Sequence, residues 1–412
     1  MHLVSFRARW WLLLGLLGHW SDVRAQTWYR DTYQGPMSAA TFETQAPGGV
    51  LKLGPVVVDA YAHGLLSYSS NALLAPVAEE GWELGYGLGF DAVWVAAKEQ
   101  QLKATGEFVQ RHVLSGPGRD RTYLALEPGS ALRYTVYLKD IRISPFLSAS
   151  RQLDPVAAPT VTNTATFKQT SFDLGVQVDW PLHHTTLQFM GLTGHKTTGG
   201  ESVSRARTDR ELLSARALRT FSATLDVGVD AFFIDQSYDN GPAASSTQFN
   251  ASLFNRWALS PNSQLKAAVG LNRYDFDAPA RPGDDPAATG WFGEIQLAQR
   301  LRPNFNYTVR LVRTQSDGVT SNYYETREIS LRPVLTLNDR TNLRLEAGWL
   351  RVVESDVAGE TGRRTNLGAE LEISLPGRWL CRAGIRDLHK SSTVAARAYR
   401  QRTVELSLRK QF

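Results

Sequence analysis

The 412-residue sequence predicts an all-β fold, namely a single antiparallel up-and-down transmembrane β-barrel of about 18 strands, with 16 as the alternative count. Three observations predict it. Long segments alternate apolar and polar side chains with period two, short turns alternate with longer polar loops, and the last strand-like segment stays apolar to its final residue. A closed barrel accounts for all three, because its last strand pairs with its first and no sheet edge remains.

The first 25 residues have the organisation of a secretory signal peptide. Arg7 and Arg9 precede the apolar stretch WWLLLGLLG, and small residues lead to Ala25, after which we expect cleavage. This stretch is too short for a helix across a hydrocarbon layer of ~30 Å, which needs about 20 residues. Residues 26–50 are expected to form a periplasmic lead or a small plug, and residues 51–412 the barrel.

The alternation is clearest in segments 82–94, 172–180 and 221–233. These segments exceed the about five or six residues of a typical globular strand and match the ~9–11 residues of a tilted membrane strand. We therefore assign their apolar faces to lipid and their polar faces to the lumen. In the third segment this assignment places Leu225, Val227 and Val229 toward lipid, and Thr224, Asp226 and Asp230 toward the lumen.

Two kinds of connection alternate along the chain. Short turns are expected at 98–101, 138–140, 181–184, 218–220, 260–263, 302–304, 338–341 and 376–378. Longer polar stretches lie between them, including 115–122, 151–168, 197–209, 236–247, 277–289 and 357–365. Outer-membrane barrels show this asymmetry, with tight periplasmic turns and long extracellular loops. Pro128 and Pro145 decide between 18 and 16 strands, because proline interrupts strand pairing.

The composition agrees with a membrane barrel. The mean hydropathy of −0.27 is that of a soluble chain, but half of each barrel strand is polar and faces the lumen. Cys381 is the only cysteine, so a disulfide framework is excluded. Tryptophans near the predicted strand ends suit the two membrane interfaces; they are Trp82, Trp94, Trp180, Trp257, Trp291, Trp349 and Trp379.

The C-terminal segment VELSLRKQF reads as a strand that ends with the chain. Val404, Leu406, Leu408 and Phe412 share one face, and Lys410 interrupts the pattern. An apolar face that reaches the last residue requires a neighbouring strand on each side. We therefore expect this strand to close the barrel.

Residues 51–74 (LKLGPVVVDAYAHGLLSYSSNALL), the glycine-alternating strand after them, the repeated hairpins and Phe412 resemble the β-barrel porin type 2 family and its outer-membrane relatives. Ser70 and Asn71 stand where relatives often carry Asp-Asn, and Lys410 stands where an apolar residue is usual. The resemblance implies an outer-membrane barrel with a role in diffusion or polysaccharide export. It also implies insertion by the barrel-assembly machinery, with Leu408 and Phe412 as the assembly signal.

Arginine is the prominent charged residue. Of 45 Lys and Arg residues 36 are Arg, and from position 291 onward 20 Lys and Arg stand against 13 Asp and Glu. Rings of charged side chains set pore selectivity, so this excess favours anionic solutes. Structural cross-strand pairing, worth about 0.2–1 kcal/mol per pair, is the alternative. The pore-lining candidates are Arg310, Arg344, Glu346, Glu370, Glu372, Arg382 and Arg386, with Glu372 opposite Arg382 if Leu375 pairs with Trp379.

The pattern favours a passive, porin-like pore for small hydrophilic solutes. The sequence contains no catalytic motif and no metal-ligand spacing, so we assign no catalytic residue, metal or cofactor and expect no enzyme. His183 and His184 are interpreted as solvated turn residues. The alternatives are an outer-membrane component of exopolysaccharide secretion, a structural or adhesive barrel, and an outer-membrane enzyme. Expected partners are membrane lipid and lipopolysaccharide, the assembly machinery, and solutes or polysaccharide, but no nucleic acid.

Overall fold

The computed structural model describes residues 51–72, 74, 76–116, 121–154, 167–200, 203–239, 245–277, 285–317, 321–355 and 359–412. The expected signal peptide and the 26–50 segment lie outside these residues. Within the described ranges, no helix has the length and apolar character needed to cross a membrane.

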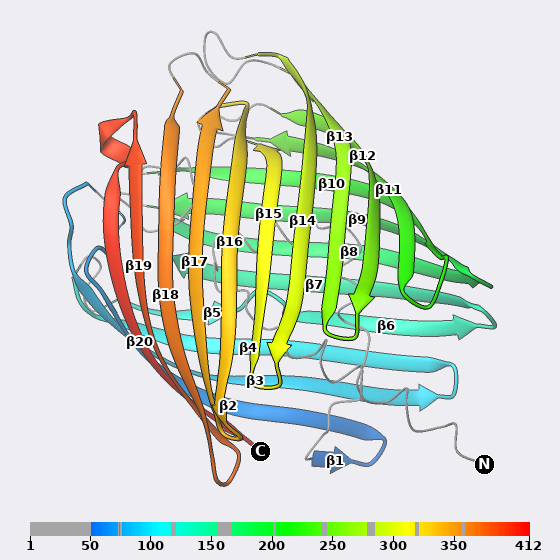
Figure 1. Ribbon diagram of the computed structural model, residues 1–412, viewed down its shortest axis with the longest axis horizontal. Coiled ribbons are helices and arrows are strands. Elements are labelled where there is room, and N and C mark those ends of the chain that lie inside the picture. Colours follow the sequence, from blue (N-terminus) through cyan, green and yellow to red (C-terminus); the bar gives the residue numbers. More distant parts are fainter. Residues whose placement is uncertain are drawn as a thin grey trace.

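One antiparallel sheet closes into a barrel of 18 strands, and the strands of its near and far walls cross, as tilted barrel strands do (Figure 1). The elements are β1 Leu51–Leu53, β2 Val56–Ser69, β3 Gly81–Ala97, β4 Gln100–Ser115, β5 Thr122–Leu126, β6 Ala131–Leu138, β7 Ile141–Asp154, β8 Phe167–Leu182, β9 Thr185–Gly200, β10 Val203–Thr220, β11 Leu225–Tyr238, β12 Ser246–Ser260, β13 Ser263–Phe276, β14 Ala287–Arg302, β15 Phe305–Asp317, β16 Tyr323–Asn338, β17 Thr341–Glu354, β18 Thr361–Leu375, β19 Trp379–Ser392, η1 Ala395–Arg397 and β20 Tyr399–Gln411.

The count of 18 follows from how two of the short segments pair. Strands β5 and β6 both lie between β4 and β7, so together they form one barrel strand. Pro128 and Gly129 separate them, and Gly129 has a φ of 97°, which a residue with a Cβ rarely adopts. Among the described strands, β1 pairs only with β2. The predicted 18 strands are therefore confirmed, and Pro145 lies inside β7 without ending it.

Strands β2 and β20 form the closing seam. They pair from Tyr61 opposite Gln411 to Ser69 opposite Thr403. The backbone N–H of Phe412 donates to the carbonyl of Ala60 at 2.9 Å. The terminal strand is thus held between β19 and β2, as its apolar face predicted.

The two faces of the wall differ as the alternation predicts. On β11, the outward Val229 is 54% exposed, whereas the inward Asp230 forms an ion pair with Arg216 of β10 at 3.2 Å. Large apolar side chains are exposed on the outer face all round the barrel, including Leu88, Leu174, Phe233, Leu271, Ile329, Leu367, Ile385 and Leu406. An outer apolar band and an inner polar wall are the arrangement of a membrane barrel.

Most of the short turns lie where the sequence predicts them. They occupy 98–99, 139–140, 183–184, 261–262, 303–304, 339–340 and 376–378. We call this end of the barrel the short-turn end and the opposite end the long-loop end.

Two predicted connections were wrong. Residues 218–220 belong to β10, because the N–H of Thr220 still bonds the carbonyl of His184. The turn follows at 221–224 and holds Thr224, which therefore does not face the lumen from a strand. The predicted loop 197–209 is largely strand, because the β9–β10 ladder continues to Gly200 opposite Val203.

Candidate functional site: a charged inner wall

Four predicted residues form one ion-pair network on β17, β18 and β19. Arg344 contacts Glu370 at 3.2 Å and Glu372 at 2.9 Å, and Arg382 contacts Glu372 at 2.9 Å. The register places Glu372 opposite Arg382 and Leu375 opposite Trp379, as the hairpin predicted. Two guanidinium groups thus share two carboxylates, so this part of the wall carries charged groups with little net charge.

The other predicted residues lie on the same inner face. Arg310 contacts Glu294 of β14 at 2.6 Å, and Glu346 accepts from Arg332 of β16 at 3.3 Å. Arg386 lies opposite Gly368, two alternation steps from Arg382. The structure therefore brings all seven candidates onto one wall, although they come from four strands.

The N-terminal half of the wall carries equivalent pairs that sequence reasoning missed. Arg111 contacts Glu83 and Glu127, both within 3.0 Å. Further pairs join strands β7 to β11; they are Arg142–Asp179, Arg210–Asp173 and Arg216–Asp230. The same alternation marks these positions as inward, so the signal was present. Balanced pairs of this kind add nothing to the net charge, which marks the C-terminal third alone.

The C-terminal charge excess lies mostly outside the inner wall. Four inward arginines of β15 to β19 contact carboxylates, as described above. Many other basic side chains of this third lie on turns, at strand ends or on the outer face, among them Arg302, Arg313, Arg327, Arg340, Arg351, Arg363, Arg378, Arg400 and Arg402. The net charge of the segment therefore does not measure the charge of the lumen.

The glycine-alternating strand has a structural explanation at the seam. Gly87 and Gly89 of β3 face inward, where the rings of His63 and Tyr61 from β2 lie against them. A Cβ at Gly87 would lie 2.8 Å from the His63 ring. The Tyr61 hydroxyl donates to Glu107 at 3.0 Å, and the Arg409 guanidinium lies 3.5 Å from the centre of the Tyr61 ring. The glycines thus make room for a polar aromatic group beside the last strand.

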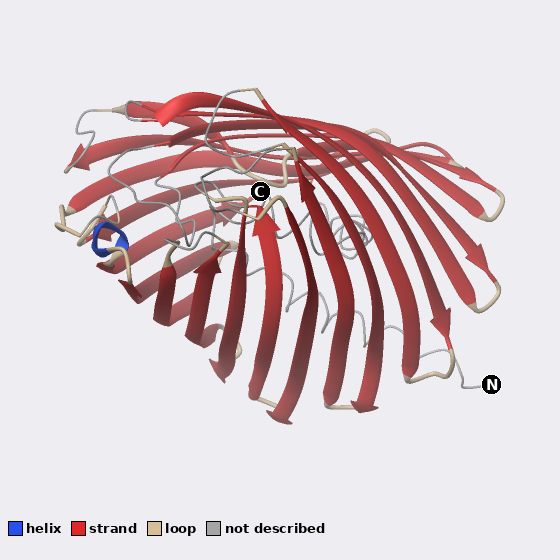
Figure 2. Ribbon diagram, turned by 90° about the horizontal axis from the view of Figure 1, so that it is seen from above, coloured by secondary structure: helices blue, strands red, loops and turns tan. Residues whose placement is uncertain are grey.

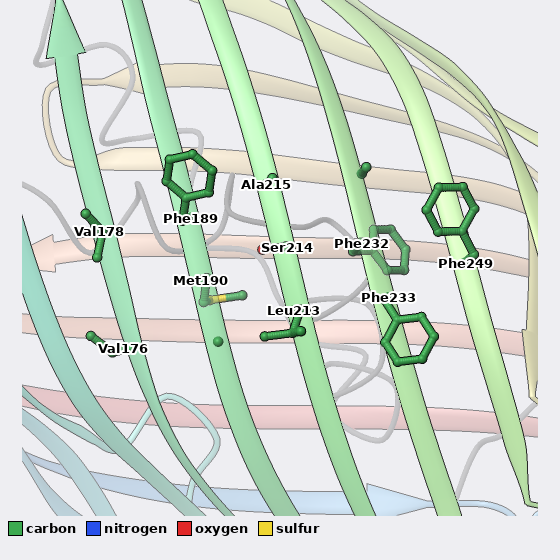
Figure 3. Close-up of a pocket in the computed structure, with 12 residues that line it drawn as sticks. Val176, Val178, Phe189, Met190, Leu213, Ser214, Ala215, Phe232, Phe233 and Phe249 are labelled. Atoms are coloured by element: carbon green, nitrogen blue, oxygen red, sulfur yellow. The ribbon is translucent and has the colours of Figure 1, made fainter.

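An apolar depression lies on the outer surface and not on the charged wall. It measures about 530 Å³ and is formed where Phe189, Leu213, Phe233 and Phe249 surround smaller residues such as Ala215 (Figure 3). Its lining is almost entirely apolar. A surface of this kind suits acyl chains and offers no converging polar groups for chemistry.

No cluster suited to a metal occurs among the described side chains, where three or more His, Cys, Asp or Glu would have to converge. His183 and His184 occupy the β8–β9 turn with ring centres 4.0 Å apart, and His183 has a φ of 50°. Both imidazoles are exposed. The turn interpretation agrees with this position.

A second charged cluster lies at the long-loop end beside η1, which lies at the rim of the barrel (Figure 2). Arg397 contacts Glu354 at 2.9 Å and Glu360 at 3.1 Å. Lys390 contacts Glu360 at 2.7 Å, and the side chain of Glu360 is fully buried. Buried carboxylates need such partners, so this rim cluster holds η1 and residues 359–360 against β17 and β19.

Comparisons with known proteins support the fold and not a family. No protein-family model and no curated protein matches the sequence. Solved structures from Pseudomonas aeruginosa match in fold. OccK2 (OpdF) has 13% identity and a TM-score of 0.53, and the match covers 87% of this chain and 97% of that one. The outer membrane protein OpdK has 14% identity and a TM-score of 0.50, with 86% and 99% covered. The resemblance to the porin type 2 family therefore stays a prediction.

Proposed function

We propose that this chain is a passive, porin-like pore of a bacterial outer membrane for small hydrophilic solutes. The observation that carries the proposal is the closed 18-stranded barrel with charged pairs on its inner face and an apolar band outside. A barrel of 16–18 strands is wide enough for an aqueous channel. Apolar side chains would line the inner face if the barrel only needed a packed core.

The fold comparison supports the proposed outer-membrane location and the proposed pore function. OpdK is an outer membrane protein, and one of its crystal structures holds vanillate. That fact concerns OpdK. For this chain it supports a small carboxylate as the first solute to test, because guanidinium groups on the inner wall suit carboxylates.

The proposed preference for anions rests on the inner arginines. Arg344 and Arg382 are largely neutralised by Glu370 and Glu372, so we propose a weak preference. The preference should fade as salt shortens the Debye length below about 10 Å.

Planar-bilayer recording of the purified barrel tests the pore. We expect stepwise conductance from the wild type. A properly folded barrel without conductance would contradict the proposal and favour a structural or adhesive role.

Reversal potentials in a salt gradient test the solute charge. Replacing Arg344, Arg382 and Arg386 together by Gln should move the potential toward cations, because the carboxylates beside them lose their partners. The control replaces Arg302, Arg340 and Arg378 by Gln, which removes the same charge from the short-turn end. A wild-type potential on the cation side that the first triple variant leaves unchanged would show that these arginines are structural partners only.

A further inference from the structure

Four arginines lie directly opposite one another on the outer face of β15, β16, β17 and β18. The register pairs Arg313 with Arg327, Arg327 with Arg351, and Arg351 with Arg363. Neighbouring strands are about 4.8 Å apart, so four positive groups share a short stretch of wall. Like charges directly opposite one another destabilise a sheet. We call these four residues the arginine row.

The protein neutralises the arginine row only in part. Glu325 contacts both Arg313 and Arg327 at 2.7 Å. Arg351 and Arg363 have no ion-pair partner among the described side chains, and Nε of Arg351 is buried without a hydrogen bond. The Arg313 guanidinium lies 4.0 Å from the centre of the Trp291 ring, which is itself exposed on the outer face. The positive charge of the arginine row is therefore not fully neutralised by the protein. An external anionic ligand could neutralise the rest.

The arginine row lies where the apolar band ends. On β15 and β16 it follows the exposed Leu311 and Ile329 by one alternation step toward the long-loop end. On β20 the same boundary is marked by Val404 and then Arg402. Arg402 and Arg400 share one carboxylate, that of Asp387, at 3.9 and 2.7 Å. Two further outward arginines thus lie at this boundary on β20, beside the seam.

The wall at β10 and β11 differs at the corresponding boundary. There the outward positions beyond Leu213 and Phe233 are Glu211 and Asp235, which lie directly opposite each other. Other outward arginines at this end, Arg207 of β10 and Arg273 of β13, each have a carboxylate partner, Asp209 and Asp275. The arginines that face one another lie on β15 to β18, with Arg400 and Arg402 on β20.

We propose that the arginine row, with Arg400 and Arg402, binds the phosphate groups of an outer-leaflet glycolipid. The proposal rests on the outer-membrane placement proposed above, since the long-loop end then meets the outer leaflet. Arginine suits this ligand because its planar fork binds phosphate through two parallel hydrogen bonds. The apolar band below the row contacts the acyl chains of the same molecule, and the phosphates neutralise the opposed guanidinium groups.

Lipid binding to the folded, full-length barrel in detergent tests the proposal. Native mass spectrometry would count bound diphosphoryl lipid A, with enzymatically dephosphorylated lipid A as the second probe. We expect the wild type to retain the first and lose the second. The double variant Arg351→Gln/Arg363→Gln should bind diphosphoryl lipid A about thirtyfold more weakly, since basic residues near an anionic lipid surface contribute about a factor of five each.

The control Arg302→Gln/Arg340→Gln removes two exposed arginines from the short-turn end and should leave binding unchanged. Equal losses in both double variants, or equal binding of the two lipids, would overturn the proposal. If Arg351→Gln/Arg363→Gln fails to fold, the variant Arg351→Lys/Arg363→Lys and the comparison of the two lipids with the wild type still test the proposal. Conductance of the same preparation separates the two proposals, because lost phosphate selectivity with intact conductance overturns this one alone.

Discussion

Single side chains of this barrel are specialised by the direction in which they point. Val229 and Asp230 are neighbours in sequence, yet the first is exposed on the outer face and the second is paired with Arg216 on the inner face. A substitution should therefore have opposite consequences at adjacent positions.

Val229→Arg should lower the free energy of unfolding in lipid vesicles by about 2–4 kcal/mol, because it puts a charge toward the hydrocarbon. Urea titration followed by tryptophan fluorescence would measure the loss. The matched variant Val229→Leu should change stability by less than about 1.5 kcal/mol, since only side-chain shape differs. Equal effects of the two variants would argue against a lipid-facing Val229.

Cysteine labelling tests the same register without a charge. In a Cys381→Ala background, a membrane-impermeant thiol reagent should modify Asp226→Cys in the assembled barrel and spare Val227→Cys. The reason is that residue 226 lies opposite Thr220 of β10 on the inner face, whereas residue 227 lies on the outer face. The reverse pattern would mean that β11 is shifted by one residue.

At the scale of elements, the rim cluster ties segments that are remote in sequence. Glu354 ends β17, Lys390 lies in β19 and Arg397 ends η1. Their contacts are buried, in contrast to the exposed pair of Arg207 with Asp209 on the outer face. Buried and exposed ion pairs at one end of the barrel should therefore differ in energy.

Arg397→Ala should open the rim, because it leaves Glu354 and Glu360 with fewer partners in a buried site. Breaking a buried pair costs about 3–5 kcal/mol, whereas an exposed pair contributes about 0–1 kcal/mol. Limited proteolysis should then cut near η1 in this variant and not in Arg207→Ala. Identical digestion of both variants would show that the cluster does not hold the rim.

At the scale of the whole molecule, closure depends on the last strand. The Phe412 N–H bonds Ala60, and the Gln411 amide donates to Asp59 at 2.9 Å. Leu408 pairs with Gly64 across the seam and is exposed on the outer face. The role of Leu408 and Phe412 as an assembly signal is still a prediction, and their position at the seam is compatible with it.

Deleting Phe412 should sharply reduce the amount of folded protein in the outer membrane. The shortened chain loses the final backbone bond and the terminal aromatic side chain of the closing strand. Heat-modifiable mobility of membrane fractions would measure the folded fraction, and Phe412→Tyr should retain it. Normal levels of the deletion variant would remove Phe412 from the assembly signal.

Much of the fold was predictable because the alternation of a strand is a local property. The 18 strands, the closing strand and the inward position of Arg344 and Glu372 all follow from period two and turn spacing. The β10–β11 turn was misplaced because Phe221 and Ala223 continue the apolar alternation although the chain has already left the strand. Local pattern cannot show where backbone pairing stops.

The sequence by itself determined the fold class, the faces of the strands and the chemistry of the inner wall. Only the tertiary structure decided which charges meet. Opposition of Arg313, Arg327, Arg351 and Arg363 depends on the register of four strands, and a shift of one residue would move a side chain to the other face. Register is set jointly by turns and pairing along the whole sheet, so the row on the outer surface, and with it the place of the arginine excess, became visible only in the closed barrel.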